Sequence, residues 1–236
     1  MKDKIVLITG GSRGIGKATA DEFAALGAKV IIINEDLPVN CQGGGICQQI
    51  IADVSDEVAV KAAVDSVVSE FGRIDILVNN AGIAIDKEWD ERTVLDWRRT
   101  LDVNLIGTWL MSKYVGEIMM KNKFGKIINI SSTSGMNDFS PYAVDYNASK
   151  AAVISLTKSL AIQFAPYVNV NAIAPGWVNT DMNKDLPADY LAAEAEKLCL
   201  KRIAEPSEIA TIIKFLAGDD AGYITGAVIV ADGGRL

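Results

Sequence analysis

Short apolar runs of strand length alternate with longer amphipathic segments along most of the chain. The runs are almost continuous in Val, Ile and Leu, which is typical of strands buried on both faces of a sheet. They predict strands over residues 4–10, 29–33, 50–54, 74–80, 126–131, 168–175 and 227–234. The segments between them predict helices over residues 15–26, 56–71, a long region that ends near 121, 148–164 and 206–216.

This alternation favours parallel strands, because parallel neighbours need a crossover that is usually a helix. We therefore expect an α/β fold: a Rossmann-like, doubly wound parallel sheet of about seven strands with helices on both faces. No linker or internal repeat divides the chain, so residues 1–236 are expected to form a single domain. The stretch QGGGICQQ (42–49) stands where a crossover helix between the second and third strands belongs, and that helix is expected to be short or absent.

The turn after the first predicted strand, TGGSRGIG at 9–16, is rich in glycine. In such a fold this turn aims backbone N–H groups at a ligand, and the following helix N-terminus favours a pyrophosphate. Gly10, Gly14 and Gly16 allow a tight turn, a close phosphate and close helix packing. Ala18 stands where a triphosphate-binding loop needs a Ser or Thr for magnesium, so the pattern favours a dinucleotide.

Charged residues near the second and third strands bear on the choice of dinucleotide. Glu35 or Asp36 can accept a hydrogen bond from the 2′-hydroxyl of NAD and would repel the 2′-phosphate of NADP. Arg13 in the glycine turn can instead hold that phosphate. NAD(H) and NADP(H) therefore both stay open, with a slight preference for NAD(H). Asp53 is expected to close the third strand and to accept from the adenine amino group.

Composition narrows the chemistry further. The chain has 23 basic and 30 acidic residues, a net charge of −7, which does not favour a nucleic acid or an anionic membrane as partner. No apolar run is long enough to span a bilayer, and the N-terminal run is too short for a secretory signal, so we expect a cytoplasmic protein. There is no histidine, and the three cysteines lack C-x-x-C spacing. We interpret them as reduced thiols and predict no metal site.

Without histidine, proton transfer near neutral pH must use another side chain. Tyr146 and Lys150 lie four positions apart in DYNASK, so one face of a helix would carry both. This stretch is one of several motifs that occur in the order found in the short-chain dehydrogenase/reductase family, which the chain resembles over essentially its whole length. The motifs are TGGSRGIG (9–16), Asp53, NNAG (79–82), VNLIG around Asn104, NISS (129–132), YNASK (146–150) and NAIAPGWVNTDM (171–182).

The resemblance implies a catalytic set of Asn104, Ser132, Tyr146 and Lys150 that interconverts a ketone and a secondary alcohol by hydride transfer. Tyr146 would be the general acid in reduction and the base in oxidation, with Lys150 and the positive nicotinamide favouring phenolate. Ser132 would bind the substrate oxygen, and Asn104 a water that relays protons to Lys150. From Ser132 to Tyr146 is fourteen residues, one more than is usual; counting alone would select Thr133, and the choice of Ser132 rests on the NISS motif.

The resemblance also places the cofactor along the chain. Asn79, Ala81 and Gly82 are expected beside it at the end of the fourth strand, and Val178 and Thr180 against the nicotinamide carboxamide. The full set of expected cofactor contacts is Gly10, Ser12, Arg13, Gly14, Ile15, Gly16, Glu35, Asp53, Val54, Asn80, Ala81, Gly82, Tyr146, Lys150, Pro175, Gly176, Val178 and Thr180.

The segment 180–226 resembles that of 3-oxoacyl-[acyl-carrier-protein] reductases in its TDM start, its R-x-x-x-P-x-E-I-A turn and its YITG close. This implies an acyl-thioester substrate, with acyl carrier protein as a candidate partner, and a mobile lid over about 182–204. Lys126 stands where those reductases often carry a basic docking residue, but 165–170 lacks the arginine that they usually have. The residues expected to line an apolar substrate pocket are Met136, Trp177, Met182 and Leu186.

Two other functions stay open. One is a dehydrogenase of a cyclic diol, sugar or steroid alcohol in the same family. The other is a dinucleotide-sensing protein without turnover, against which the intact Asn, Ser, Tyr and Lys set argues. The family commonly pairs its long helices, here about 92–121 and 148–164, so the resemblance also implies a homo-oligomer, a dimer or a tetramer.

Overall fold

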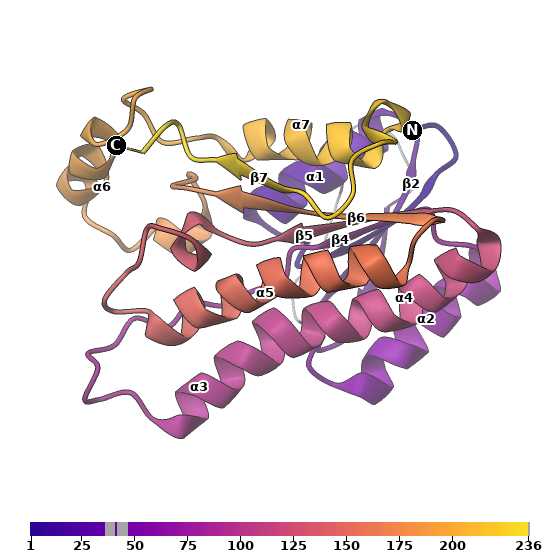
Figure 1. Cartoon of the computed structure of the whole chain (residues 1–236), viewed down its shortest axis with the longest axis horizontal. Helices are drawn as coiled ribbons and strands as arrows, with labels where there is room; N and C mark the ends of the chain where they lie inside the picture. The colour runs from indigo at the N-terminus through magenta and orange to yellow at the C-terminus, as the bar shows by residue number, and fades with distance from the viewer. Residues whose placement is uncertain (36–40, 42–46, 236) are drawn as a thin grey trace.

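The computed structural model describes residues 1–35, 41 and 47–235, which form a central sheet between two layers of helices (Figure 1). In this part of the chain the sheet has seven strands, all parallel, in the order β3-β2-β1-β4-β5-β6-β7. The strands are β1 (Ile5–Thr9), β2 (Lys29–Asn34), β3 (Cys47–Ile51), β4 (Ile76–Asn79), β5 (Gly125–Ile130), β6 (Val168–Pro175) and β7 (Val228–Ala231). The predicted doubly wound α/β fold is confirmed.

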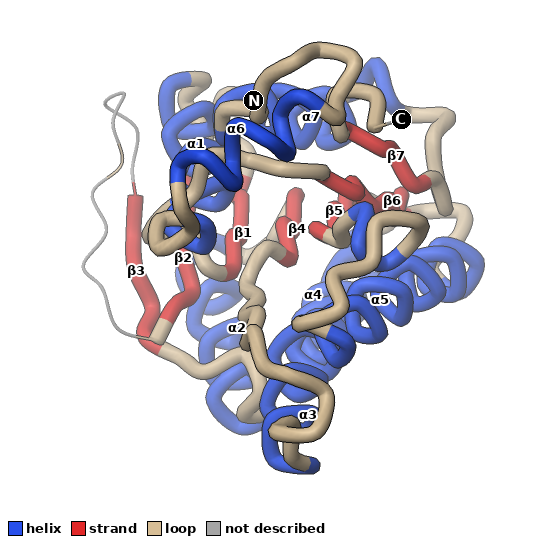
Figure 2. The backbone as a smooth tube through the Cα atoms, turned by 90° about the vertical axis from the view of Figure 1, so that its left-hand side faces the viewer, coloured by secondary structure: helices blue, strands red, loops and turns tan. Residues whose placement is uncertain are grey.

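Helices cover both faces of the sheet, as Figure 2 shows along the strands. On one face lie α1 (Gly14–Ala25) and α7 (Pro206–Ala217), and on the other α2 (Glu57–Phe71), α4 (Thr108–Asn122) and α5 (Val144–Gln163). Two shorter helices, α3 (Val94–Leu101) and α6 (Ala188–Glu196), lie toward the carboxyl ends of the strands.

The alternation of side chains along each strand divides the core into two clusters. Leu7 and Ile31 pack with the helices α2, α4 and α5, whereas their neighbours Ile8 and Ile32 pack with α1 and α7. All four side chains are essentially inaccessible to solvent. Burial on both faces is the physical reason for the continuous Val and Ile runs in the sequence.

Four elements differ from the prediction. The third strand spans Cys47–Ile51 rather than 50–54, so Asp53 lies two residues beyond its end. The long helical region is two helices joined by a π-helical segment, Asp102–Gly107. Helix α5 begins at Val144 rather than Ala148, which brings Tyr146 inside the helix, and α6 was not expected. Asp36 and residues 42–46 of the QGGGICQQ patch lie outside the described residues.

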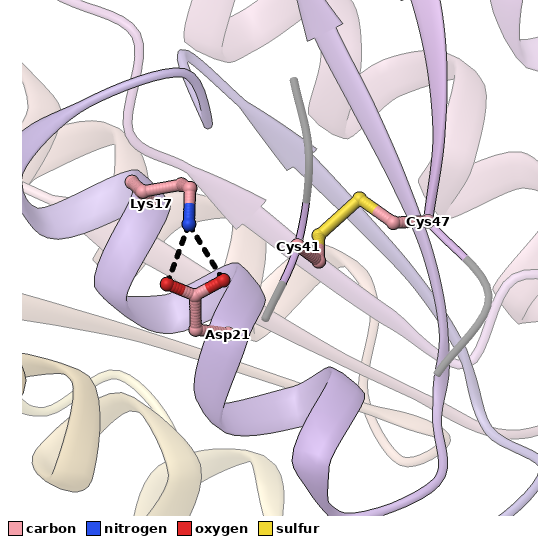
Figure 3. Close-up of a disulfide and its surroundings, with 4 residues drawn as sticks. All are labelled: Lys17, Asp21, Cys41 and Cys47. Carbon is pink, nitrogen blue, oxygen red and sulfur yellow. Dashed lines mark hydrogen bonds and ion pairs between the residues drawn. A yellow bond between two sulfur atoms is a disulfide. The ribbon is translucent and has the colours of Figure 1, made fainter. Parts of the chain in front are cut away.

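The interpretation of all three cysteines as reduced thiols is wrong for two of them. Cys41 and Cys47 form a disulfide beside helix α1, which carries the ion pair of Lys17 and Asp21 (Figure 3). The cysteines are six positions apart, and their Cα atoms are 5.9 Å apart, a distance that a disulfide spans. Cys199 is a free, exposed thiol. Among the described residues, no helix combines the length and apolar character needed to cross a membrane.

The disulfide predicts the number of reactive thiols. We expect purified protein to react with a thiol reagent at one cysteine per chain, because only Cys199 is free and exposed. After reduction in denaturant the count should rise to three. Mass spectrometry of the alkylated protein should assign the first label to Cys199. Labelling of Cys41 or Cys47 before reduction would contradict the disulfide.

Candidate active site

A pocket opens at the carboxyl edge of the sheet, where the turns after β1, β2 and β4 meet. In a doubly wound sheet this edge is where ligands bind, at the point where the strand order reverses. The described residues that line it are Gly10, Ser12, Arg13, Gly14, Ile15, Ile33, Asn34, Glu35, Ala52, Val54, Asn80, Ala81, Gly82, Ile83, Arg99, Val103, Thr180, Asp181 and Met182. Most of the expected cofactor contacts are therefore brought together in one cavity.

The glycine turn is held against the end of β4. The Asn80 side chain donates hydrogen bonds to the carbonyls of Thr9 and Gly10, at 3.1 and 2.8 Å. The Thr9 hydroxyl accepts from the backbone N–H groups of Asn80 and Ala81, both at 3.0 Å. Gly10 has a φ of +65°, and a Cβ there would lie 2.9 Å from the Ala81 Cα. The turn therefore needs glycine both for its conformation and for its close packing.

Seven of the expected cofactor contacts do not line this pocket: Gly16, Asp53, Tyr146, Lys150, Pro175, Gly176 and Val178. A Cβ on Gly16 would lie 2.2 Å from the Gly10 carbonyl oxygen, so this glycine packs α1 against the turn. Pro175 ends β6, and Gly176 lies against Asp232. Val178 is buried and pairs with Ala204. Asp53 forms an ion pair with Arg99, which lines the pocket.

Arg99 of α3 also lines the pocket. Its guanidinium binds Glu35 at 3.1 Å and Asp53 at 3.2 Å. Burial raises the pKa of Asp53, but hydrogen bonds from Ser55 and Arg99 outweigh it, so the pKa is lowered and Asp53 stays ionised. The sequence prediction missed Arg99, because a basic residue on a surface helix has no local pattern that distinguishes it.

Lys150 lies beneath the pocket and is almost fully buried. Its ammonium donates to the Ile130 carbonyl at 2.8 Å, and burial lowers its pKa to about 8. Gly82, on the pocket wall, is its neighbour: a Cβ there would lie 3.4 Å from Lys150 Nζ and 3.3 Å from Asn104 Oδ1. A side chain at position 82 would therefore separate the pocket from both residues.

Tyr146 lies one helical turn before Lys150, with Lys150 Nζ 5.5 Å from the centre of its ring. Burial raises the pKa of the Tyr146 phenol, and the hydrogen bond with Ser132 opposes this only in part. Burial is therefore the largest influence that the protein's own groups have on this pKa. In the protein alone, burial dominates and keeps the phenol protonated.

Ser132 reaches Tyr146 through a tight turn after β5. Its hydroxyl accepts from the Ser134 N–H at 3.1 Å and begins a short 3₁₀ turn, Thr133–Gly135. A Cβ on Gly135 would lie 2.6 Å from the Ala151 nitrogen, so this glycine lets the turn pack directly on α5. Of the two candidate hydroxyls, Ser132 is the one that interacts with the Tyr146 phenol and lowers its pKa.

Asn104 lies in the π-helical segment between α3 and α4, a distortion that often occurs at functional sites. Its amide accepts from Ile83 N–H at 2.8 Å and donates to the Ile83 carbonyl and the Ser149 hydroxyl at 2.9 and 3.0 Å. It thus joins the loop after β4 to helix α5.

Asn79, expected beside the cofactor, is instead buried and donates to Ser112 and Asn129.

The segment expected to be a lid contains α6, which is tied to other parts of the chain. Buried Glu194 pairs with Lys197 and with Arg235 near the C-terminus, and accepts from the Trp177 indole at 3.2 Å. Arg235 also pairs with Asp138, in the loop after Ser132. Of the residues expected to line a substrate pocket, Met182 lines the cavity described above and Met136 is 41% exposed.

Lys126 does not fit the docking role that its position suggested. Its side chain is only 5% exposed and its ammonium donates to Asn169 at 2.9 Å. Burial lowers its pKa. A buried ammonium cannot contact a partner protein, so a docking site for acyl carrier protein would have to use other residues.

Comparisons with known proteins agree with this geometry. A sequence profile described as "Enoyl-(Acyl carrier protein) reductase" matches residues 10–235. A 3-oxoacyl-[acyl-carrier-protein] reductase of Synechocystis sp. is 40% identical over 245 aligned positions, which cover 99% of this chain and 97% of that protein.

Solved structures are similarly close. The ligand-free aldohexose dehydrogenase of Thermoplasma acidophilum has a TM-score of 0.92 at 34% identity, covering 99% of this chain and 94% of that one. A structure titled "ElxO with NADP Bound" has a TM-score of 0.91 at 34% identity, covering 99% and 98%. With the sheet order, the glycine turn and these full-length matches, the chain belongs to the short-chain dehydrogenase/reductase family of oxidoreductases.

Proposed function

We propose that this protein is an NAD(P)(H)-dependent reductase of a 3-oxoacyl thioester, with Tyr146 as the proton donor. The observation that carries the proposal is the grouping of the Ser132 and Tyr146 hydroxyls with buried Lys150, which lies one helical turn after Tyr146 and beside Gly82 of the cavity wall. The names of the relatives support the substrate class. Relatives with other names, including an aldohexose dehydrogenase, share the fold.

The cavity fits a dinucleotide. Gly10 and Gly82 both line the cavity, and a Cβ would lie close to Ala81 at Gly10 and to Asn104 and Lys150 at Gly82. The cavity wall at these two positions is therefore backbone, which phosphates and ribose can approach closely. Gly14 has a φ of +55°, and a Cβ there would lie 3.2 Å from Thr180. Glycine turn residues would therefore hold the pyrophosphate, and Glu35, Asp53 and Arg99 would surround the adenosine. The bound nicotinamide supplies or accepts the hydride.

The protein's own residues would manage the proton and the developing charge. The Tyr146 phenol donates its proton to the substrate oxygen, while the Ser132 hydroxyl donates a hydrogen bond to the same atom. Lys150 then lies close to a phenolate, which its ammonium stabilises. Asn104 keeps the loop after β4 and helix α5 together, and we retain the predicted water relay from Asn104 to Lys150.

A second candidate is a dehydrogenase of a sugar or other secondary alcohol. Burial of Lys126 removes one basic residue expected to dock acyl carrier protein, and an aldohexose dehydrogenase is among the similar structures. The net charge of −7 also gives no broad attraction for an acidic carrier protein. Both candidates use the same proton donor and differ only in the carbonyl compound.

We also propose a homo-oligomer, a dimer or tetramer, in the cytoplasm. Large apolar side chains stay exposed on the helices that the family pairs: Ile106 before α4 is 38% exposed, Trp109 on α4 40% and Ile162 on α5 80%. A second copy that covers these side chains would remove apolar surface from water. Sedimentation analysis measures this directly.

The first test compares substrates and a Tyr146→Phe variant. Wild-type protein should oxidise NADH or NADPH rapidly with a 3-oxoacyl thioester and more slowly with simple ketones. In the reverse direction, it should reduce NAD or NADP only slowly with sugars. Tyr146→Phe should lower turnover at least about 1,000-fold, because the proton donor is lost, while nucleotide binding changes little. Absorbance at the nicotinamide band measures turnover, and nucleotide fluorescence measures nucleotide binding.

The outcomes separate the candidates. Turnover of sugars or diols alone would favour the second candidate. Full activity in Tyr146→Phe would contradict the proposed mechanism for both. Tyr167→Phe, on an exposed tyrosine outside the site, serves as the matched control and should be fully active.

The raised pKa of Tyr146 predicts opposite pH dependences for the two directions. Below about pH 8, where Lys150 keeps its proton, ketone reduction should change little, since the phenol is already protonated. Alcohol oxidation needs the phenolate, so its kcat/KM should rise about tenfold per pH unit over the same range. Steady-state rates in both directions check this. An oxidation rate that is flat between about pH 6 and pH 8 would contradict it.

The cofactor prediction concerns Glu35, and we propose a preference for NAD(H). The Glu35 carboxylate, held by Arg99 at 3.1 Å, would repel a 2′-phosphate. Glu35→Gln should raise the ratio of kcat/KM for NADPH to that for NADH at least about tenfold, because Arg99 can then meet the phosphate. Glu57→Gln, which breaks the pair between Glu57 of α2 and Lys113 of α4, is the control. An unchanged ratio in Glu35→Gln would remove Glu35 from cofactor selection.

A further inference from the structure

The residue before Tyr146 is a fully buried carboxylate. Asp145 has no exposed side-chain surface, and its Oδ1 accepts from the Tyr146 backbone N–H at 3.0 Å. Its other oxygen, Oδ2, accepts from the hydroxyl of buried Thr100 at 2.7 Å. Both oxygens are therefore fixed within the first turn of α5, directly beside the proposed proton donor.

The partner charge comes from 53 positions earlier in the chain. The Arg92 guanidinium donates to Asp145 Oδ1 at 2.6 Å, and its side chain is only 2% exposed. Its second terminal nitrogen donates to the carbonyls of Ile85 and Tyr142, at 2.7 and 2.6 Å. One side chain thus binds three segments: the loop after β4, the loop after β5 and the start of α5.

These three segments carry the proposed active site. The loop after β4 contains Gly82 at the cavity wall, the loop after β5 contains Ser132, and α5 contains Tyr146 and Lys150. Each of these loops is irregular backbone, so its position is not set by strand pairing. Arg92 supplies hydrogen bonds that set the position of both loops relative to the helix.

Stability alone does not account for this pair. A buried ion pair loses the hydration of both charges, and well-packed apolar residues of similar volume are often as stable or more stable. Within the described residues Arg92 Nε has no hydrogen-bond partner, which adds to the cost. Unlike apolar packing, the pair fixes the direction of five hydrogen bonds near the start of α5.

We propose that Asp145 and Arg92 are positioning residues for Tyr146, which hold its phenol and the Ser132 loop in the geometry needed for proton transfer. The proposal rests on the proposed role of Tyr146. A displacement of about 1 Å at a reacting group can cost on the order of 100-fold in rate, so the loss of these bonds should be visible in kcat. The cofactor cavity does not include Arg92 or Asp145, so nucleotide binding should be spared.

The test uses graded variants of the full-length protein. Asp145→Asn and Arg92→Met should lower kcat for ketone reduction about 10- to 100-fold per folded molecule, with the KM and Kd for the nucleotide unchanged within about twofold. Arg92→Lys, which keeps the charge but not the fork of donors, should recover part of the loss relative to Arg92→Met. Thr100→Val, which removes one hydrogen bond and keeps the shape, should lower kcat about three- to tenfold.

Folding is measured on the same samples, by circular dichroism and thermal unfolding, because breaking a buried pair can destabilise the protein. Thr100→Val keeps the test decisive if the charge variants fail to fold. Asp65→Asn, which breaks the exposed Lys61–Asp65 pair on α2, is the control and should match wild type. Folded Thr100→Val with wild-type kcat would overturn the proposal. A loss of nucleotide affinity as large as the loss in kcat would also overturn it, because that would indicate a general disturbance of the site rather than a loss of Tyr146 positioning.

The Tyr146→Phe variant separates this inference from the proposed function. If Tyr146→Phe is fully active, the role of Tyr146 itself is wrong. If Tyr146→Phe is inactive and the folded Asp145 and Thr100 variants turn over normally, only the positioning role is wrong. Loss of kcat in all three, with nucleotide binding retained, supports both.

Discussion

All strands of the described sheet run parallel, and this constraint places the functional segments at one edge. Each strand must end where its crossover begins, so the turns after β1, β4, β5 and β6 all start at the same side of the sheet. Strand order reverses between β1 and β4, and the crossovers on either side leave in opposite directions. The Asn80 hydrogen bonds to Thr9 and Gly10 join the two turns at that point. The cavity and the site beneath it follow from this arrangement.

Most of the fold could be predicted from the sequence, because strands buried on both faces leave short, continuous apolar runs rich in Val and Ile. The exception is informative. β3 is an edge strand whose residues are only partly buried, and it begins Cys-Gln-Gln, so its hydrophobic signal is weak. Its limits are set by pairing with β2 rather than by its own composition. Helix α6 was missed for a similar reason, since it has a single buried residue, Glu194, and that residue is charged.

The site divides in the same way. The glycines of the turn could be predicted, because glycine is the residue type that such a tight turn needs. Tyr146 and Lys150 could be predicted because their helical spacing puts them on one face. Arg99 and Arg92 could not. Their partners lie 46 to 64 positions away for Arg99 and 53 for Arg92, and a long-range ion pair leaves no local pattern in the sequence. Asp145 stands in the DYNASK stretch, but its proposed positioning role depends on Arg92, which the stretch does not contain.

The electrostatics of the site bear on the direction of the reaction. Burial disfavours the charged form of both central groups, lowering the pKa of Lys150 to about 8 and raising that of Tyr146. The protein alone therefore presents a protonated phenol, the state that reduction of a ketone requires. Phenolate, the state that oxidation requires, depends on an added positive charge, which the oxidised nicotinamide carries and the reduced one lacks. Under the proposed mechanism, the oxidised cofactor thus favours the phenolate that oxidation needs, whereas the reduced cofactor leaves the phenol protonated for reduction.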